Sequence, residues 1–436
     1  MRKTLLAAII VIGIAAGLAG QTAANPALAP LDSIYPDLDK LYIDLHQTPE
    51  LSLHEERTAA KLAARLKALG YEVTTGVGGT GVVAILKNGK GPVVLVRADM
   101  DALPVEERTG LAYASKVTTK DDSGATVSVM HACGHDIHMT SLIGAATLLA
   151  RAKDRWRGTL FLIAQPAEEK GGGAMAMLKA GLFTRFPKPD FAISFHDKAS
   201  MPAGKLIYTP GFAFANVDSV DLTIYGRGGH GAYPHTTVDP IVIAARTILA
   251  LQTIVSREEN PLDPAVVTVG SIHGGAKHNI IPDEVKLLIT VRSYKEEVRK
   301  RILASIERIA KAEAAAAGAP TPPKVEVTEG TPATYNDPAL TKRIAGALGK
   351  AFGESNVVEG QPTMGGEDFS EYGRAGVPAV QFEVGAVEKG KYEASQKNGT
   401  PLPSLHSSEF APDREPTIRM GASSLTVAAL ELLGKP

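Results

Sequence analysis

"GVVAILKNGKGPVVLVRADMD", residues 81–101, contains two runs of β-branched and aliphatic residues separated by Asn88-Gly89. Each run has the length and composition of a buried strand, and Asn-Gly is typical of a tight turn between paired strands. We therefore predict two strands here, joined as a pair. The second run ends at Asp99 and Asp101, so carboxylates follow the end of a buried strand.

Helical and strand patterns alternate on both sides of this stretch. Before it, Ser52 and Glu55 match a capping box, and apolar residues then recur at helical spacing until Gly70. After it come a helix that begins near Asp136, a strand over 159–165, a helix after 171–173 and a strand over 190–196. This alternation predicts an α/β fold with a mainly parallel sheet and helices on both faces.

The order of the elements changes near Asn216. From there the patterns read strand, helix, strand, strand, helix, strand. This is the split βαβ order of ferredoxin-like domains, so we predict an inserted α+β domain over residues 216–330. Residues 30–215 and 331–436 would then form the two parts of the first domain.

The N-terminus has the pattern of a secretory leader. Two basic residues precede an apolar run over residues 5–19, and small residues follow. The run is shorter than the roughly 20 residues that span a membrane, which argues against a permanent anchor. We assign residues 1–29 to a signal peptide cleaved between Gly20 and Ala29. The protein is then expected outside the cytoplasm, periplasmic or extracellular, with no membrane association once the leader is removed.

Composition and motif context argue against several classes of partner. The chain has 46 basic and 47 acidic residues, so it has no overall positive field for nucleic acid. Residues 76–81 match the dinucleotide fingerprint G-x-G-x-x-G, but a strand follows them instead of the helix that this fingerprint requires. The chain also has one cysteine, which excludes an internal disulfide. In an exported protein such a thiol is expected to be buried or bound to a ligand.

Side chains that can bind a metal lie where the predicted strands end. They are Asp99 and Asp101, Glu168 and Glu169, His196 and Asp197, and later His406, with Cys133 and His135 at the start of a helix. Ligands of open α/β sheets bind outside the carboxyl ends of the strands, so these groups should converge. Thiolate, imidazole and carboxylate all bind divalent transition metals. The sequence therefore predicts a metal site at this edge, with a catalytic thiol as the alternative.

Seven motifs, in order, resemble those of the dinuclear metal amidohydrolases of the aminoacylase and carboxypeptidase clan, which include hippurate hydrolases, N-acyl-amino-acid amidohydrolases and auxin-conjugate hydrolases. The motifs are "ADMDALP", "MHACGHDIH", "QPAEE", "GGHGAYPH", "HNIIPD", "MGGEDFS" and "LHSSEF". The resemblance covers essentially the whole chain after the leader. It implies hydrolysis of the amide bond of small N-acyl or N-aroyl amino acids, with the inserted domain acting as a lid and commonly as the surface of a homodimer.

The resemblance also implies a role for individual residues. Two divalent ions would be held by Cys133, His135, Glu169, His196 and His406, with Cys133 bridging them. Zinc or manganese is expected first, and cobalt or nickel are alternatives. Glu168 would be the catalytic carboxylate, and Asp101 would orient a ligand, whereas Asp99 could equally cap the following turn. His230, often supplied by the partner subunit, and Asn279 would stabilise the oxyanion.

Several loops depart from the pattern of the resembled family. "DKASM" follows His196 where relatives have an aromatic residue and proline, "KGGG" follows "PAEE", and "GAY" occurs in the lid loop. These loops should touch the substrate, so the acyl group and the amino acid stay open, and Arg292 is a candidate for binding the substrate carboxylate. A metallo-dipeptidase or carboxypeptidase is the alternative within the same chemistry. A metal-dependent exported binding protein without catalysis is the alternative of another class.

Overall fold

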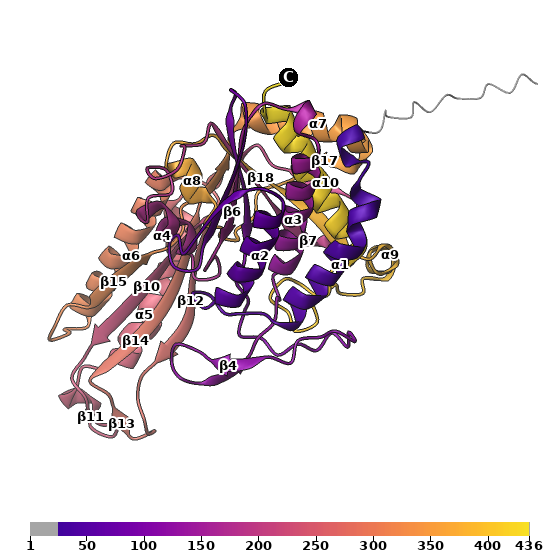
Figure 1. Cartoon of the computed structure of the whole chain (residues 1–436). Coiled ribbons are helices and arrows are strands. Elements are labelled where there is room, and N and C mark those ends of the chain that lie inside the picture. Colours follow the sequence, from indigo (N-terminus) through magenta and orange to yellow (C-terminus); the bar gives the residue numbers. More distant parts are fainter. Residues whose placement is uncertain (1–24, 436) are drawn as a thin grey trace, which may run out of the picture.

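The computed structural model describes residues 25–435. A large sheet carries most of the helices, and a smaller sheet formed by the middle of the sequence projects to one side (Figure 1). The predicted leader, residues 1–29, lies outside the described residues apart from residues 25–29.

The large sheet has eight strands. They are β1 (Glu72–Thr75), β2 (Val82–Asn88), β3 (Val93–Asp99), β6 (Gly158–Gln165), β7 (Phe191–Pro202), β8 (Leu206–Tyr208), β17 (Val357–Glu359) and β18 (Ala379–Val387). Their order is β1-β2-β6-β3-β7-β18-β8-β17. The central strands β6, β3, β7 and β18 are parallel, and β1 and β2 add an antiparallel edge. The mainly parallel sheet predicted from the alternating pattern is thus confirmed.

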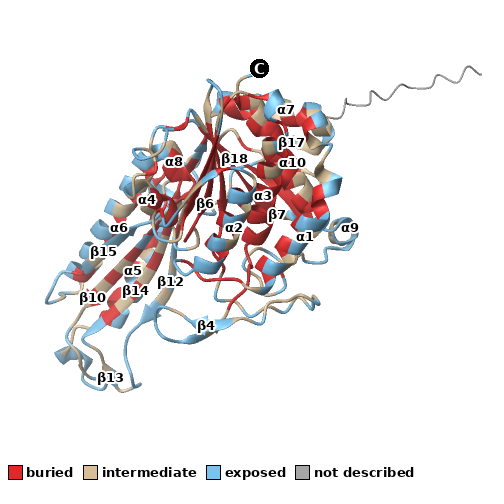
Figure 2. Cartoon of the chain, viewed as in Figure 1, coloured by how far each residue is buried: buried red, intermediate tan, exposed pale blue. Residues whose placement is uncertain are grey.

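Helices cover both faces of this sheet. One face packs against α1 (Leu31–Gln47), α2 (Glu56–Ala68), α3 (His135–Arg151), α7 (Pro338–Phe352) and α10 (Arg414–Leu432), and the other against α4 (Gly173–Lys179) and α8 (Ser370–Arg374). Alternate residues of each strand supply the two cores: Val94 and Val96 face the first set of helices, and Leu95 faces the second. The strands are therefore buried on both sides, as Figure 2 shows in red.

The strands β2 and β3 are present as predicted, but their predicted pairing is wrong. β6 lies between them, antiparallel to β2 and parallel to β3. Residues 89–92 cross over the end of β6 instead of folding back as a hairpin, and the Asn88 side chain donates to the backbone oxygens of Lys153 and Trp156. Asn-Gly marks the turn correctly, but a later segment of the chain takes the place between the two strands.

The predicted capping box is also wrong. The Ser52 hydroxyl donates to Asp101 Oδ2 at 2.6 Å, and Glu55 binds backbone N–H groups outside α2. The N-terminus of α2 is instead served by Glu50, whose carboxylate accepts from the Thr58 N–H at 2.8 Å. Glu55 accepts from the loop around residue 168, and Ser52 contacts this loop only through Asp101, as described below.

The smaller sheet forms the lid. Its strands are β10 (Asn216–Tyr225), β12 (Ala265–His273), β14 (Glu284–Ser293) and β15 (Lys324–Glu329), in the fully antiparallel order β12-β14-β10-β15. One face is covered by α5 (Pro240–Thr253), which continues into the π-helical turn η4 (Ile254–Glu258), and by α6 (Glu296–Ala316). This is the ferredoxin-like arrangement, so the predicted fold class is confirmed. By length and composition the stretch Pro240–Glu258 could cross a membrane, but its buried side chains pack on this sheet.

Short elements complete the described chain. They are β4 (Thr118–Lys120), β5 (Thr126–Ser128), β9 (Gly211–Phe214), β11 (Gly229–His230), β13 (Ile280–Ile281), β16 (Thr334–Asn336), α9 (Lys389–Asn398) and the 3-10 turns η1 (Pro26–Leu28), η2 (Lys153–Arg155), η3 (Pro234–Thr236) and η5 (Glu354–Asn356). The pair β11–β13 forms the tip of the lid, far from the large sheet (Figure 1).

Candidate metal centre

Five side chains predicted as metal ligands meet at one edge of the large sheet. Glu169 follows the end of β6, but His196 lies within β7, which continues to Pro202, so the prediction that a strand ends at His196 is wrong. Cys133 Sγ lies 3.5 Å from His196 Nε2 and 3.2 Å from His406 Nε2. Glu169 Oε1 lies 3.4 Å from His406 Nε2 and 3.9 Å from His135 Nε2. The ligand atoms form two compact groups, one of Cys133, His135 and His196 and one of Cys133, Glu169 and His406. Cys133 belongs to both groups, as a bridging thiolate would require.

Two backbone positions make this convergence possible. Gly134, between Cys133 and the start of α3, has a φ of 77°, and a Cβ there would press against the Asp197 carboxylate. Glycine therefore lets the cysteine loop approach β7 closely. His406 has a φ of 65°, and its N–H donates to the Ala132 oxygen at 2.8 Å, which ties the late loop to the cysteine loop.

The donor atoms of this cluster fit divalent transition metals. His135 Nε2 and Glu169 Oε1 are buried without a hydrogen-bond partner among the described residues. An unpaired buried polar atom costs about 1–3 kcal/mol, so these atoms point to a missing partner. Burial and the nearby Glu169 carboxylate raise the pKa of Cys133 well above its ordinary value, so a thiolate here needs a cation beside it. Sulfur, imidazole and carboxylate donors in such a cluster suit zinc and related ions.

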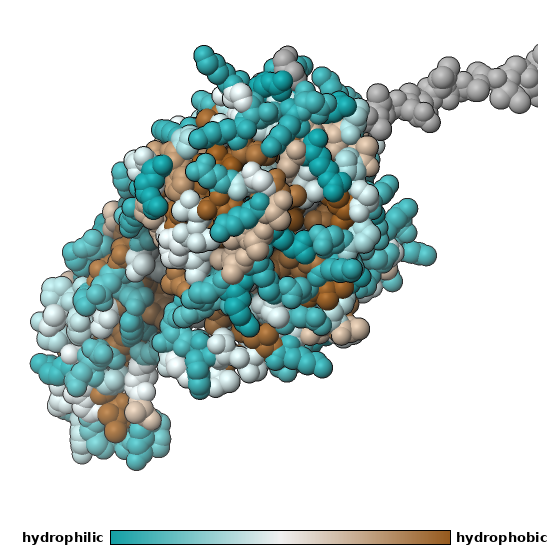
Figure 3. All heavy atoms as spheres, viewed as in Figure 1, coloured by the Kyte–Doolittle hydropathy of each residue, from teal (hydrophilic) through white to brown (hydrophobic). Residues whose placement is uncertain are grey.

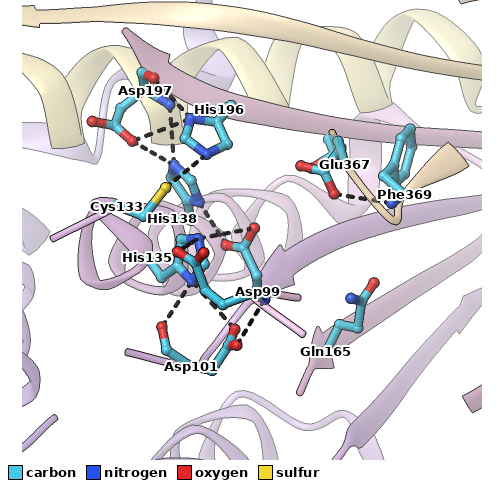
Figure 4. Close-up of polar contacts among 12 residues, drawn as sticks. Asp99, Asp101, Cys133, His135, His138, Gln165, His196, Asp197, Glu367 and Phe369 are labelled. Carbon is cyan, nitrogen blue, oxygen red and sulfur yellow. Dashed lines mark hydrogen bonds and ion pairs between the residues drawn. The ribbon is translucent and has the colours of Figure 1, made fainter. Parts of the chain in front are cut away.

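Backbone carbonyls orient two of the imidazoles. His135 Nδ1 donates to the Asp101 carbonyl at 2.8 Å, and His196 Nδ1 donates to the Asp197 carbonyl at the same distance. Each Nε2 is thereby turned toward the cluster (Figure 4). Asp101 contacts the predicted ligand His135 as expected. The shorter contact is made by its backbone carbonyl, and its carboxylate Oδ1 lies 3.4 Å from His135 Nδ1.

His138 is a buried residue of the site to which the sequence analysis gave no role. Its Nδ1 lies 2.6 Å from Asp99 and its Nε2 lies 2.9 Å from Asp197, so it links the end of β3 to the middle of β7 (Figure 4). Burial lowers its pKa, but the two carboxylates outweigh burial and raise the pKa to about 9. The spacing of three residues from His135, which puts both on one helix face, was the signal that could have identified it. Asp99 thus binds side chains and does not merely cap a turn.

Glu168 lies partly buried in the cleft, next to Glu169. Burial and the carboxylates of Glu367 and Asp368 raise its pKa well above the ordinary value. Those two acidic groups are held by the buried Arg97, at 2.8 Å from Glu367 and 3.0 Å from Asp368. Glu168 is therefore a carboxylate with a raised proton affinity beside the ligand cluster, a property typical of a general base or acid.

The cluster opens into a cleft of about 780 Å³ between the large sheet and the lid. The lid contributes the uncovered face of its sheet. The large domain contributes the loop after β6, the second half of β7, and the loops around residues 363–367 and 402–406. Arg292 of β14 lines this cleft, is half-buried, and donates to Thr290 and the Val291 carbonyl. It has no acidic ion-pair partner among residues 25–435, which leaves its guanidinium available to an anion.

Two predicted oxyanion residues do not reach this cleft within one chain. His230 in β11 is exposed, and its Nδ1 accepts from the Ala232 N–H at the tip of the lid. Asn279 lies beside it, where its carbonyl accepts from the Gly231 N–H. Neither residue lines the cleft described above. Their predicted roles require that the lid tip reach a second subunit.

Comparison with known proteins extends these observations. The family model described as peptidase family M20/M25/M40 matches residues 95–401. Thermostable carboxypeptidase 1 of Saccharolobus solfataricus is 37% identical over 395 residues, covering 90% of this chain and 94% of that protein. Hippurate hydrolase of Campylobacter jejuni is 39% identical over 338 residues, covering 76% and 84%. The crystal structure of Bacillus subtilis YXEP, described as a dinuclear metal binding peptidase, has 30% identity and a TM-score of 0.74, covering 92% of this chain and 100% of that one.

These similarities extend over both sheets and over the strand ends that carry the predicted ligands. A likeness on this scale cannot reflect one shared motif, and it agrees with the family predicted from the motifs. The chain therefore belongs to peptidase family M20/M25/M40 and is a metal-dependent hydrolase.

Proposed function

We propose that this protein hydrolyses the amide bond of N-acyl or N-aroyl amino acids. The observation that supports this most is the position of Glu168, which lies beside two overlapping ligand groups. The same cleft contains Arg292, which has no acidic ion-pair partner among residues 25–435. A free α-carboxylate suits a guanidinium, which can bind it with two parallel hydrogen bonds. The similarity to a hippurate hydrolase supports the same substrate class.

The residues of the chain divide the chemistry between them. Divalent ions held by the five ligands would polarise the amide carbonyl and lower the pKa of water to about 7. Glu168 would accept the proton of the attacking water and return it to the leaving amine, a task that its raised pKa favours. Arg292 would hold the amino-acid carboxylate against the lid.

The experiment is a release assay over a panel of N-acetyl, N-benzoyl and N-arylacetyl amino acids, combined with elemental analysis of the purified protein. We expect two divalent ions per chain and turnover of at least one substrate type. Glu168→Gln should keep the metal content and abolish turnover. A metal-loaded protein that hydrolyses none of the panel would refute the substrate class. Full activity of the Gln variant would refute the role of Glu168.

A carboxypeptidase or dipeptidase is the second candidate, because a thermostable carboxypeptidase is similar over 90% of the chain. In that case the acyl half of the substrate is itself an amino acid. Comparing kcat/KM for dipeptides with that for the matching N-acyl amino acids separates the two functions. A metal-dependent binding protein would instead retain its ligand in the Glu168→Gln variant and show no turnover in either form.

We also infer a homodimer formed through the lid. The strand β12 is an unpaired edge, and the helix α5 exposes the apolar side chains of Ile241, Val242 and Leu249. Figure 3 shows apolar surface toward the tip of the lid. A partner on this side could receive His230 in its cleft. Leu249→Glu should convert the dimer to a monomer, as measured by the molar mass from light scattering. A monomeric, fully active wild-type protein would contradict the inference.

We further propose that the protein is exported and that its leader ends before Asn25. Ala27 is only 3% exposed, and its N–H donates to the Asn25 side chain at 3.1 Å. The turn η1 also packs against α3 and α10, so a cut at Ala29 would remove part of the fold. Thr22-Ala23-Ala24 supplies the small residues that leader peptidases require. The intact mass of protein from the periplasm or medium should correspond to a chain that starts at Asn25.

A further inference from the structure

The loop that carries Glu168 has an unfavourable backbone conformation. Ala167, directly before Glu168, has a φ of 50°, in the left-handed region that non-glycine residues rarely adopt. Such a residue is strained and persists only where its surroundings hold it in place. Two contacts outside the loop do so.

Two buried carboxylates hold the backbone on either side of Glu168. Glu55 Oε1 accepts from the Ala167 N–H at 2.9 Å, and Asp101 Oδ2 accepts from the Glu169 N–H at 3.0 Å. Glu55 is fully buried, and Asp101 is 1% exposed. The residue between the two bonded amides is thus fixed in position and direction.

The two carboxylates are themselves held by the segment before α2. The Ser52 hydroxyl donates to Asp101 Oδ2 at 2.6 Å, and the Leu53 N–H donates to Glu55 Oε1 at 3.0 Å. Leu53 is a second non-glycine residue in the left-handed region, with a φ of 72°. Thr80 donates to the other oxygen of Glu55 at 2.5 Å. One carboxylate therefore joins two strained backbone positions that are far apart in the sequence.

We propose that Glu55 is a positioning residue for catalysis, which acts by holding the Ala167 backbone so that the Glu168 carboxylate faces the ligand cluster. The inference rests on the proposed role of Glu168 as the proton-transferring group. It explains why Ser52 and Glu55 do not cap α2, a task that Glu50 performs: their oxygens are used in the site. Glu55 has no ion-pair partner among the described residues, so its burial is balanced by these three hydrogen bonds.

The test compares Glu55→Ala, Glu55→Gln and the control Glu50→Ala. Glu50 is also buried, lies in the same segment and accepts backbone N–H groups, but at the start of α2. A misplacement of about 1 Å can lower a rate roughly a hundredfold, so we expect kcat of Glu55→Ala to fall about 10- to 100-fold with KM and metal content unchanged. Glu55→Gln should stay within about threefold of wild type, because its amide oxygen can accept both N–H groups and its amide nitrogen can donate to Thr80.

Hydrogen exchange supplies a readout that does not depend on turnover. Peptides covering residues 160–175 should exchange faster in metal-free Glu55→Ala than in wild type or Glu50→Ala. If the alanine variant does not fold, Thr80→Val, which releases one oxygen of Glu55, should lower kcat by a smaller factor. Equal kcat for wild type, Glu55→Ala and Thr80→Val, or equal losses in the Ala, Gln and Glu50→Ala variants, would overturn the proposal.

The outcome also separates this inference from the proposed function. An active Glu168→Gln variant would remove the premise, whatever Glu55→Ala does. An inactive Glu168→Gln variant together with a fully active Glu55→Ala variant would refute only the positioning role.

Discussion

A mixed dimer gives a quantitative test of an active site shared between subunits. Glu168 lies in the cleft of its own chain, whereas His230 belongs to β11, at the lid tip, and does not line that cleft. We would prepare Glu168→Gln and His230→Ala separately and allow their subunits to exchange. Loss of one oxyanion donor costs about 2.7–4 kcal/mol, and loss of a general base typically costs a factor of about 10²–10⁴. Each variant alone should therefore be nearly inactive.

The expected recovery follows from the geometry. With random exchange, half of the dimers contain one subunit of each kind. In such a dimer, one site combines the intact Glu168 of the first subunit with the intact His230 of the second, and the other site carries both defects. One site in four is then complete, so the mixture should regain roughly a quarter of the wild-type kcat under isologous symmetry.

The assay is amino-acid release from N-benzoylglycine or from the best substrate of the panel, before and after exchange, with mixed dimers counted by mass. The control mixes Glu168→Gln with Glu169→Gln. Both of these changes lie in the same half of the site, so their mixed dimers contain no complete site. If mixed dimers form and activity does not exceed the sum of the parents, the shared-site proposal is refuted.

Three further results are expected. His46 pairs with Asp136 at 2.7 Å and with Glu107 at 3.1 Å, and these partners outweigh burial and raise its pKa from 6.5 to about 9. This stabilisation, at most about 3 kcal/mol, is complete below pH 6.5 and should be lost as pH rises toward 9. The difference in free energy of unfolding between wild type and His46→Gln, measured in urea at several pH values, should therefore decrease from pH 6.5 to pH 9. Lys198, in the "DKASM" stretch after His196, lies 2.7 Å from Glu383 in the cleft. Changing the pair to Met and Gln should raise kcat/KM for N-benzoyl over N-succinyl substrates about tenfold, measured by competition, and an unchanged ratio would contradict contact with the acyl group. Chelation should lower the unfolding temperature, with recovery on adding zinc or manganese, as measured by calorimetry.

Sequence patterns predicted the parts of the fold that depend on local periodicity. The strands on both sides of Asn88-Gly89 and the order of elements after Asn216 are present as expected. Pairing depends on which later segment competes for a strand edge, and nothing in residues 81–101 shows that β6 enters between β2 and β3. The same limit applies to Ser52, whose hydroxyl satisfies a capping pattern locally but binds Asp101 in the fold.

In the candidate site too, some residues could be predicted from the sequence and others could not. Metal ligands come from a few residue types, and in an α/β sheet they gather near one edge, so Cys133, Glu169 and His196 could be found from residue type and approximate place, although β7 continues past His196 to Pro202. Residues that position the site have no such restriction. Glu55 acts on a backbone N–H 112 positions away, and what makes this contact necessary is the left-handed φ of Ala167, a property of the folded chain. The proposed positioning role of the Glu55 carboxylate depends on the strained backbone at Ala167, so it can be recognised only in the folded structure, where the two residues are in contact.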